Sequence, residues 1–541
     1  MANATQGMYA PLPQSISDSD SEKELQVDSI HKKSVNGIHK GFERSANGYM
    51  IPNCTMDNVK IKRGFKSMSL SRKYCFLFSI LACFLTIAIF LWVLPCSEND
   101  TCPMHISNWE NQHEDFEFKS RINIVNSAFA DSYNLVILFK KSLNDADSKN
   151  GAMCILGNNG GISWYTPQVK EPADLNCYLI DVNGDGVKDC LLLGEMGLQA
   201  VDPISGQILY HVHNQNAEKG INSIDIPVIL PDLNKDGINE MITVINGKVF
   251  HNKLVIVCGR TGMLLSKVLL KHCLDVVGLK YENKKFLYSC MNSTTTRYFE
   301  ISYIDIENRY YNRSYDVTSI PINYTHAYNN EYKLSEHKLI VNNTGICPDC
   351  QSTIILLDNK DNQLWSLSHI NSYAMKPTTF TFKSTKSNLL LLKGHINGYI
   401  VKLWQWSNYR MAKQDHIIDK RYASSMDTTI QTNFINERIV LITFNGTNVH
   451  VINASLIEIT QLCFPIDGEY ACQPDLANQE ESLLIADLDN DKSQELVSYS
   501  STFELKDGIW KLISHMKVIR LEAELPKLYE VSPPKLYEIL L

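Results

Sequence analysis

The chain has 541 residues, a formal net charge of −8, and 44% hydrophobic against 20% charged residues. This mildly acidic balance argues against a polyanionic partner, so we expect no binding to nucleic acid. The distribution of polar and apolar residues then divides the chain into five predicted parts.

Residues 1–73 are predicted to form a disordered cytoplasmic tail, because the first 60 or so are polar and too poor in apolar residues to offset chain entropy. Four serines alternate with acidic residues in a pattern typical of acid-directed kinase substrates, which predicts phosphorylation at Ser15, Ser17, Ser19 and Ser21. Residues 9–12 (YAPL) have the form of an endocytic sorting signal, although so short a pattern also arises by chance.

Residues 74–94 (YCFLFSILACFLTIAIFLWVL) are uncharged and apolar over a length that crosses the roughly 30 Å hydrocarbon core as a helix. Six basic residues precede this stretch between 60 and 73, whereas Glu98 and Asp100 follow it. Basic residues stay on the cytoplasmic side, so the sequence predicts a single-pass type II membrane protein at the plasma membrane or an endomembrane. Cys75 and Cys83 in this stretch are expected to face lipid, with helix association as the alternative.

After a stalk at 95–105, residues 106–530 are predicted to form the ectodomain, followed by a C-terminal tail at 531–541. Twelve of the 15 cysteines lie beyond residue 95, which fits disulfides in an oxidising compartment without fixing their connectivity. The same region carries predicted N-glycosylation sites at Asn292, Asn312, Asn323, Asn342, Asn445 and Asn453.

Three short acidic loops recur in the ectodomain, each between two apolar, strand-like runs. They are residues 181–189 (DVNGDGVKD), 232–240 (DLNKDGINE) and 487–495 (DLDNDKSQE). Oxygen donors at positions 1, 3 and 5, a carbonyl at 7 and a carboxylate at 9 suit a hard cation such as Ca²⁺, and glycine at 6 permits the sharp turn. An EF-hand would need glutamate at position 12 and flanking helices, but position 12 of the first loop is Leu192. In the third loop Lys492 replaces the glycine, so that loop is either a metal site or a structural turn.

The loops also indicate a repeat. The first two begin 51 residues apart, and the second and third begin 255 residues apart, which is five times 51. Between them lie recurring hairpin units that start at Gly161, Gly206, Gly262, Asn362 and Gly398. A repeat of this length built from short strands predicts an all-β, seven- or eight-bladed β-propeller. Five tryptophans are interpreted as core residues between blades, namely Trp164, Trp365, Trp404, Trp406 and Trp510.

These loops resemble the calcium loops of FG-GAP repeats, and the whole layout resembles the ITFG-type single-pass membrane proteins, which contain integrin-alpha FG-GAP repeats. The Gly-x-Ile-x-Trp hairpins look more like the blades of quinoprotein-type propellers. The resemblance implies structural Ca²⁺ ligands at Asp181, Asn183, Asp185, Val187 and Asp189, with Val187 acting through its carbonyl. It implies the same roles for Asp232, Asn234, Asp236, Ile238 and Glu240, and the equivalent positions of the third loop are Asp487, Asp489, Asp491, Ser493 and Glu495.

The sequence contains no zinc-protease, serine-hydrolase or phosphate-loop motif. Cys347 and Cys350 form a Cys-x-x-Cys pair outside any βαβ context, which favours a structural disulfide over a redox centre or zinc site. Asp487-Leu-Asp489 belongs to the repeated loop, which disfavours a glycosyltransferase, and no cofactor pocket suggests a quinoprotein dehydrogenase. We therefore expect that the protein is not an enzyme.

The sequence favours a calcium-stabilised, glycosylated, membrane-anchored scaffold whose ectodomain loops bind a protein partner. One alternative is an auxiliary subunit that acts through the transmembrane span. A luminal type II enzyme is the third hypothesis.

Overall fold

The computed structural model describes residues 70–92 and 108–521, apart from 129–131, 146–147, 214–224, 246–252, 271–272, 274, 293–294, 314–316, 324–329, 385–393, 408–429, 446–447 and 467. The chain divides into two compact units, Met1–Pro95 and Cys96–Leu541. The predicted phosphorylation sites and the sorting signal lie outside the described residues.

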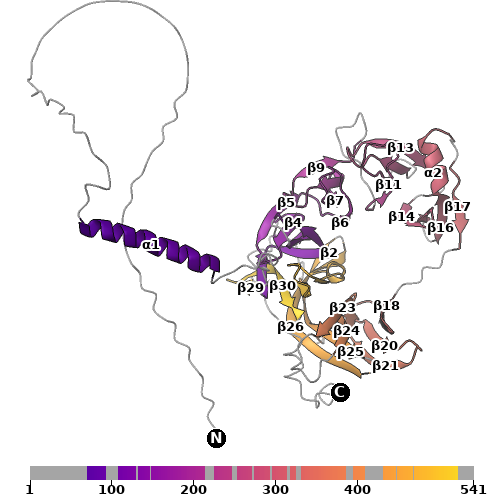
Figure 1. The fold of residues 1–541 in the computed structure, drawn as a ribbon. Coiled ribbons are helices and arrows are strands. Elements are labelled where there is room, and N and C mark those ends of the chain that lie inside the picture. Colours follow the sequence, from indigo (N-terminus) through magenta and orange to yellow (C-terminus); the bar gives the residue numbers. More distant parts are fainter. Residues whose placement is uncertain are drawn as a thin grey trace, which may run out of the picture. The chain divides into compact units, whose positions relative to one another are not determined.

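The described part of the first unit is helix α1, Leu70–Trp92 (Figure 1). No glycine or proline interrupts this run, so a continuous helix follows, and the prediction of a helix here is confirmed. Residues 74–87, whose side chains are described, are all exposed. Within the described residues, no helix is long and apolar enough to cross a membrane. The membrane span stays a prediction.

The second unit consists of antiparallel sheets, and its described residues form seven of them. In chain order, the first three sheets contain β2 (Phe116–Asn126), β3 (Tyr133–Lys141), β4 (Asn150–Leu156) and β5 (Ile162–Gln168); β6 (Asp174–Ile180), β7 (Asp189–Gly194), β8 (Gly197–Val201) and β9 (Ile208–His211); and β10 (Val228–Ile229), β11 (Met241–Ile245), β12 (Lys253–Val257) and β13 (Leu264–Leu269). Each is a four-stranded meander in which strands consecutive in sequence pair with each other.

The next two sheets keep the same order. They contain β14 (Asp275–Glu282), β15 (Lys285–Asn292), β16 (Thr295–Ser302) and β17 (Ile320–Ile322); and β18 (Glu331–Leu334), β19 (His337–Thr344), β20 (Gln351–Leu357) and β21 (Gln363–Ile370). Among the described residues of this unit, two short helices interrupt the strands: α2 (Tyr303–Tyr310), capped by Ser302, and α3 (Leu476–Gln479), capped by Asp475.

The sixth sheet is larger and has six strands. They are β22 (Ser372–Ala374), β23 (Thr378–Ser384), β24 (Gly394–Trp406), β25 (Gln431–Asn445), β26 (Asn448–Ile466) and β27 (Glu469–Gln473). This sheet runs from residue 372 to residue 473, about twice the predicted repeat of 51, and β25 and β26 form a long hairpin within it.

The seventh sheet joins the two ends of the ectodomain. Its strands are β28 (Leu483–Ala486), β29 (Glu495–Lys506), β30 (Ile509–Arg520) and β1 (Trp109–Glu114), and β1 pairs with β30. Strands β2 and β30 consequently lie side by side (Figure 1). A seventh sheet completed by the first strand is the arrangement expected of a propeller.

The spacing of the acidic loops predicted too many blades between the second and third loops. Four sheets separate the starts of these loops, in place of the five equal units that 255 residues suggested. The long β25–β26 hairpin and the extra strands of the sixth sheet account for the surplus residues. Seven sheets in the described residues match the lower predicted number, and the blade count of the whole ectodomain stays a prediction.

Aromatic residues join neighbouring sheets through one repeated contact. The indole of Trp164 at β5 lies against Gly206, where an added Cβ would meet the ring at 2.5 Å, and its Nε1 donates to the Pro203 carbonyl at 2.8 Å. Trp109 makes the same contact with the turn at Gly157 and Gly160, and Tyr210 makes it with the turn at Gly259 and Gly262. These contacts confirm the core interpretation of Trp164, and the buried Trp404 and Trp406 agree with it.

Four of the five predicted hairpin units start at or beside the turn between the third and fourth strands of a sheet, but the unit at Gly398 does not. Gly398 lies inside β24 and pairs with strands on both sides, β23 and β25. A Cβ there would meet the ring of the cross-strand Phe380 at 2.4 Å. Glycine at this position makes room for a side chain, and the prediction of a turn was wrong.

The described residues contain four disulfides: Cys177–Cys190, Cys273–Cys290, Cys347–Cys350 and Cys463–Cys472. The prediction of disulfides is confirmed, including the bond within the Cys-x-x-Cys pair. Cys154 and Cys258 are buried free thiols, whereas Cys96 and Cys102 lie outside the described residues.

Candidate functional site

The three acidic loops occupy equivalent places in three sheets. Each connects the first strand of a sheet to the second: β6 to β7, β10 to β11, and β28 to β29. In an antiparallel meander, equivalent connections emerge at the same end of the strands. The first two loops belong to consecutive sheets, and the third belongs to the sheet that joins the chain ends.

The backbone of each loop folds around its own side-chain oxygens. In the first loop, Asp181 accepts the N–H groups of Gly184 at 2.6 Å and Gly186 at 2.8 Å, and Asp185 accepts that of Val187 at 2.8 Å. In the second loop Asp232 and Asp236 accept the same three bonds. In the third loop two of the three recur: Asp487 at position 1 accepts the N–H of position 6, and Asp491 at position 5 accepts the N–H of position 7. Such bonds fix short polar side chains in a tight turn.

Position 6 has a left-handed backbone in all three loops. Its φ is +90° at Gly186, +90° at Gly237 and +69° at Lys492. Glycine adopts this conformation without steric cost, whereas the Cβ of lysine makes it less favourable. The predicted sharp turn is therefore present even where the glycine is missing.

The carboxylate at position 9 is buried in every loop and makes one shared hydrogen bond. Asp189 accepts the backbone N–H of Val182 at 2.7 Å, Glu240 accepts that of Leu233, and Glu495 accepts that of Leu488 at 2.9 Å. The side chains are 1%, 0% and 0% exposed, respectively. The second oxygen of each carboxylate has no hydrogen-bond partner among the described residues.

Burial makes these carboxylates weak acids. Desolvation raises the pKa of Asp189 to about 6 and that of Glu495 to about 7, and it also raises the pKa of Glu240. Nearby acids of the same loops, such as Asp181 and Asp185 beside Asp189, add to the rise. A buried, partly unpaired carboxylate beside two others is a site that a cation would stabilise.

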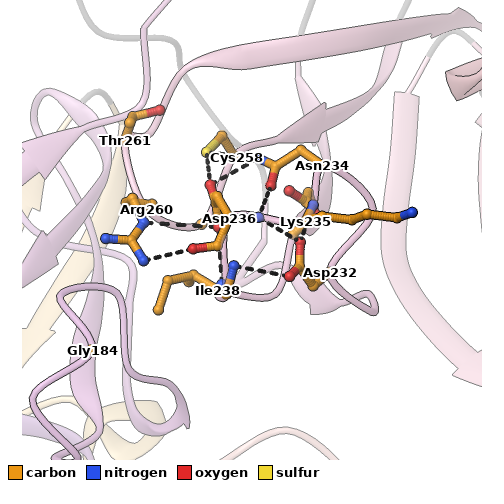
Figure 2. A network of polar contacts seen from close by, with 12 residues as sticks. Gly184, Asp232, Asn234, Lys235, Asp236, Ile238, Cys258, Arg260 and Thr261 are labelled. Carbon is orange, nitrogen blue, oxygen red and sulfur yellow. Dashed lines mark hydrogen bonds and ion pairs between the residues drawn. The ribbon is translucent and has the colours of Figure 1, made fainter.

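Position 2 anchors each loop in the core. Val182, Leu233 and Leu488 are all buried among apolar residues of their sheets. The first two loops also pack together, because Val182 of the first and Ile238 of the second belong to one apolar cluster, and a Cβ added at Gly184 would meet Ile238 at 3.7 Å (Figure 2). A change in one loop therefore reaches the other by direct packing.

The third loop carries a cation supplied by the chain itself. The guanidinium of Arg520 forms an ion pair with Asp491, and its Nη1 lies 3.8 Å from Asp489 Oδ2. Arg520 pairs directly with Glu495 in the β29–β30 register, which places it over the loop. Sequence reasoning missed this residue, because it lies 25 positions after the loop and only strand register brings it there.

The second loop has a different neighbour at the same place. Met241 pairs with Val257 in the β11–β12 register, and Glu240 directly precedes Met241 while Cys258 directly follows Val257. Cys258 therefore lies opposite position 9, as Arg520 does in the third loop. Cys258 was likewise missed. In the first loop the corresponding residue is Asp202, which accepts bonds from Ile204 and Ser205 in its own turn.

All fifteen predicted ligand residues thus lie in three loops of one geometry. Their oxygen donors suit Ca²⁺, and the unpartnered oxygens of Asp189 and Glu240 are the observation that fits a bound cation. In the third loop, positive charge already faces Asp489 and Asp491.

The predicted glycosylation sites with described side chains are exposed: Asn312, Asn323, Asn342 and Asn453. Exposure is necessary for attachment of a glycan, and the modification itself stays a prediction. The side chains of Asn292 and Asn445 are outside the described set.

The fold and the loops define an all-β, propeller-like protein with repeated acidic turns. Sequence comparison gives a match to the FAM234A/B beta-propeller family over residues 151–285. Protein FAM234B of Mus musculus is 28% identical over 112 residues, which are 20% of this chain and 18% of that protein. Protein FAM234A of Bos taurus is 23% identical over 209 residues, which are 34% of this chain and 36% of that protein.

The chain matches well under half the length of either relative. These matches support a β-propeller family, but they do not support the ITFG-type assignment that the loops suggested. The family match includes both of the first two acidic loops, which fall within residues 151–285.

Solved structures give weaker likenesses. BBS1N in complex with ARL6DN is 9% identical, with 74% of this chain and 92% of that chain covered and a TM-score of 0.29. BamB from Moraxella catarrhalis is 7% identical, with 74% and 99% covered and a TM-score of 0.20. At these low TM-scores the likeness says nothing about function.

Proposed function

We propose that the protein is a non-enzymatic scaffold whose propeller-like ectodomain is stabilised by calcium and presents its loops to a protein partner. The observation that carries this proposal is the shared state of the position 9 carboxylates. Each carboxylate is buried, and one of its oxygens accepts a hydrogen bond from a backbone N–H. The other oxygen has no hydrogen-bond partner among the described residues. A divalent cation supplies the missing partner.

The cation acts through charge neutralisation. In the first loop Asp181, Asp185 and Asp189 lie close enough to raise the pKa of Asp189, so three negative charges repel when all are ionised. Calcium removes this repulsion and fixes the connection between β6 and β7. Because Val182 and Ile238 belong to one apolar cluster, the first two loops then form one rigid surface. Rigid loops on a stable scaffold are the usual place for partner binding.

The third loop has the same unpartnered oxygen, on Glu495, but it already contains a positive charge. Arg520 supplies positive charge to Asp489 and Asp491. An arginine with fixed geometry holds two carboxylates by charge-assisted hydrogen bonds. The loops thus share one fold but use two sources of positive charge.

Calcium titration of the purified full chain by calorimetry tests the proposal. We expect a binding event that Asp185→Ala abolishes at the first loop and that Glu458→Ala, an exposed carboxylate on β26, leaves intact. Equal calcium binding by the wild type and Asp185→Ala would reject the first loop as a calcium site.

We further propose that residues 74–94 anchor the chain as a type II membrane protein, with a glycosylated luminal or extracellular ectodomain. The exposed apolar side chains of α1 support this, including Phe78 at 72% and Phe84 at 68% exposure. Apolar surface on every side of a helix is costly in water and favourable in lipid. Alkaline carbonate extraction of cell membranes should leave the chain in the pellet, and release into the supernatant would reject the anchor.

A second candidate function is an auxiliary subunit that contacts another membrane protein through α1. The same exposed side chains favour it. Deletion of residues 106–530 distinguishes the two functions, because a partner bound through α1 is retained and a partner bound by the ectodomain loops is lost.

A further inference from the structure

The second loop differs from the first in the residue that stands across from position 9. Cys258 follows β12 and is a buried free thiol, 4% exposed. Its sulfur lies 3.4 Å from Asp236 Oδ2 and 3.5 Å from Asn234 Nδ2 (Figure 2). The thiol therefore faces the loop and not the apolar core.

Three ligand atoms of different residues converge at this place. The Cys258 sulfur and one carboxylate oxygen each of Asp236 and Glu240 all lie within 4.8 Å of one another. Glu240 is 0% exposed, and its Oε1 has no hydrogen-bond partner among the described residues. A buried oxygen without a partner, beside a thiol and a second carboxylate, is an incomplete polar cluster.

The chemistry of these donors separates this loop from a pure calcium site. Ca²⁺ takes six to eight oxygen ligands and gains little from sulfur, whereas Zn²⁺ binds thiolate and carboxylate in four-coordinate sites. Arg260 also lies beside Asp236, with Nη2 donating to its carbonyl at 2.7 Å and Nε 3.8 Å from Oδ1. This positive charge repels Ca²⁺ and Zn²⁺ alike, so the preference for Zn²⁺ rests on the sulfur ligand.

We propose that the second loop binds a borderline-soft divalent cation, of which Zn²⁺ is the type, through Cys258, Asp236 and Glu240. The inference rests on the proposed function in one respect, that the loop is a cation site. On binding, the Cys258 thiol gives up its proton to solvent and the sulfur becomes a ligand, so the hydrogen bond from the thiol to Asp236 is replaced by two bonds to the metal.

The other buried free thiol offers a matched comparison. Cys154 lies in β4 within an apolar cluster that includes Val136 and Trp164. It is an ordinary core cysteine, and its loss should change packing without changing metal binding.

Cobalt titration of the purified, metal-free full chain tests the proposal, because thiolate bound to Co²⁺ gives an intense ultraviolet charge-transfer absorption. We expect this band to saturate, to disappear when Zn²⁺ is added and to persist when the same concentration of Ca²⁺ is added. The band should be absent in Cys258→Ala and unchanged in Cys154→Ala. If Cys258→Ala does not fold, Glu240→Gln keeps the shape of the side chain and should weaken Co²⁺ binding at least tenfold.

A wild-type chain without the band would overturn the proposal, and so would a band that survives in folded Cys258→Ala. These failures differ from failure of the proposed function. Calcium binding that Asp185→Ala removes, together with no cobalt–thiolate band, rejects only the inference about the second loop. A cobalt–thiolate band without calcium binding rejects calcium at the first loop and leaves this inference standing.

Discussion

One carboxylate oxygen of Asp189 accepts the backbone N–H of Val182 at 2.7 Å, and its other oxygen is buried without a hydrogen-bond partner among the described residues. The same relationship joins Glu240 to Leu233 and Glu495 to Leu488. Because one bond ties the end of each loop to its start, the loop is already closed before a cation arrives. The cation then has only to complete the ligand sphere, with little ordering of the chain.

Replacement of Arg520 by methionine should destabilise the third loop and make it respond to calcium. The change leaves Asp489 and Asp491 close together without the guanidinium that faces them. We expect the free energy of unfolding to fall by about 3 kcal/mol without calcium, since one partner of a mostly buried ion pair is removed. Calcium should restore part of this loss, which chemical denaturation with and without calcium measures.

Lys517→Met is the matched control for that variant. Lys517 lies on the same strand and pairs with Glu110 at 3.3 Å, but both side chains are about half exposed. An exposed pair contributes less than about 1 kcal/mol, so this variant should unfold like the wild type and show no new calcium response. Equal losses in both variants would mean that Arg520 has no special role.

Gly206→Ala should be among the more destabilising single-methyl additions in the ectodomain. Its Cβ would meet the Trp164 ring at 2.5 Å, and its φ of +71° is unfavourable for alanine. We expect a loss of about 3 kcal/mol in the free energy of unfolding. Gly508→Ala has a similar φ of +79° but open space around the new methyl group, so it should cost only about 1 kcal/mol. Equal costs would show that the ring contact is unimportant.

Glu117 should make folding less favourable as pH rises. Burial raises its pKa from 4.5 to about 7, although the Asp475 N–H donates to it at 2.8 Å. Between these values the folded chain keeps a proton that the unfolded chain has released, so the contribution to stability is present at low pH and is lost as pH rises to about 7. The loss amounts to about 3 kcal/mol.

Glu117→Gln removes this titration while preserving side-chain shape. The difference in free energy of unfolding between the wild type and the variant should therefore decrease between about pH 4.5 and pH 7 and then level off. Denaturant unfolding at several pH values measures it. A difference that is constant with pH would show that Glu117 titrates at its ordinary pKa.

Local sequence patterns predicted what depends on neighbouring residues. The turns of the acidic loops were predictable, because Asp181 and Asp185 accept hydrogen bonds from backbone N–H groups only a few positions away. The recurring hairpin units likewise predicted the turn at Gly206. The uninterrupted apolar run at 74–94 predicted a helix that α1 confirms.

The residues that complete the loops depend on strand pairing and were not predictable from local sequence. Arg520 and Cys258 reach their loops across a neighbouring strand, and nothing in their own sequence neighbourhood indicates this. Gly398 was misinterpreted for a similar reason, since the ring of Phe380 that it accommodates lies on another strand. The blade spacing failed where the long β25–β26 hairpin departs from the repeat.

The most direct test of the calcium-stabilised scaffold is the thermal unfolding of the full chain with calcium and with chelator, for the wild type and Asp185→Ala. We predict that calcium raises the melting temperature of the wild type by several degrees, because it binds only the folded loop, and that Asp185→Ala loses most of this shift. An unchanged melting temperature in the wild type, or the same shift in both proteins, would contradict the account.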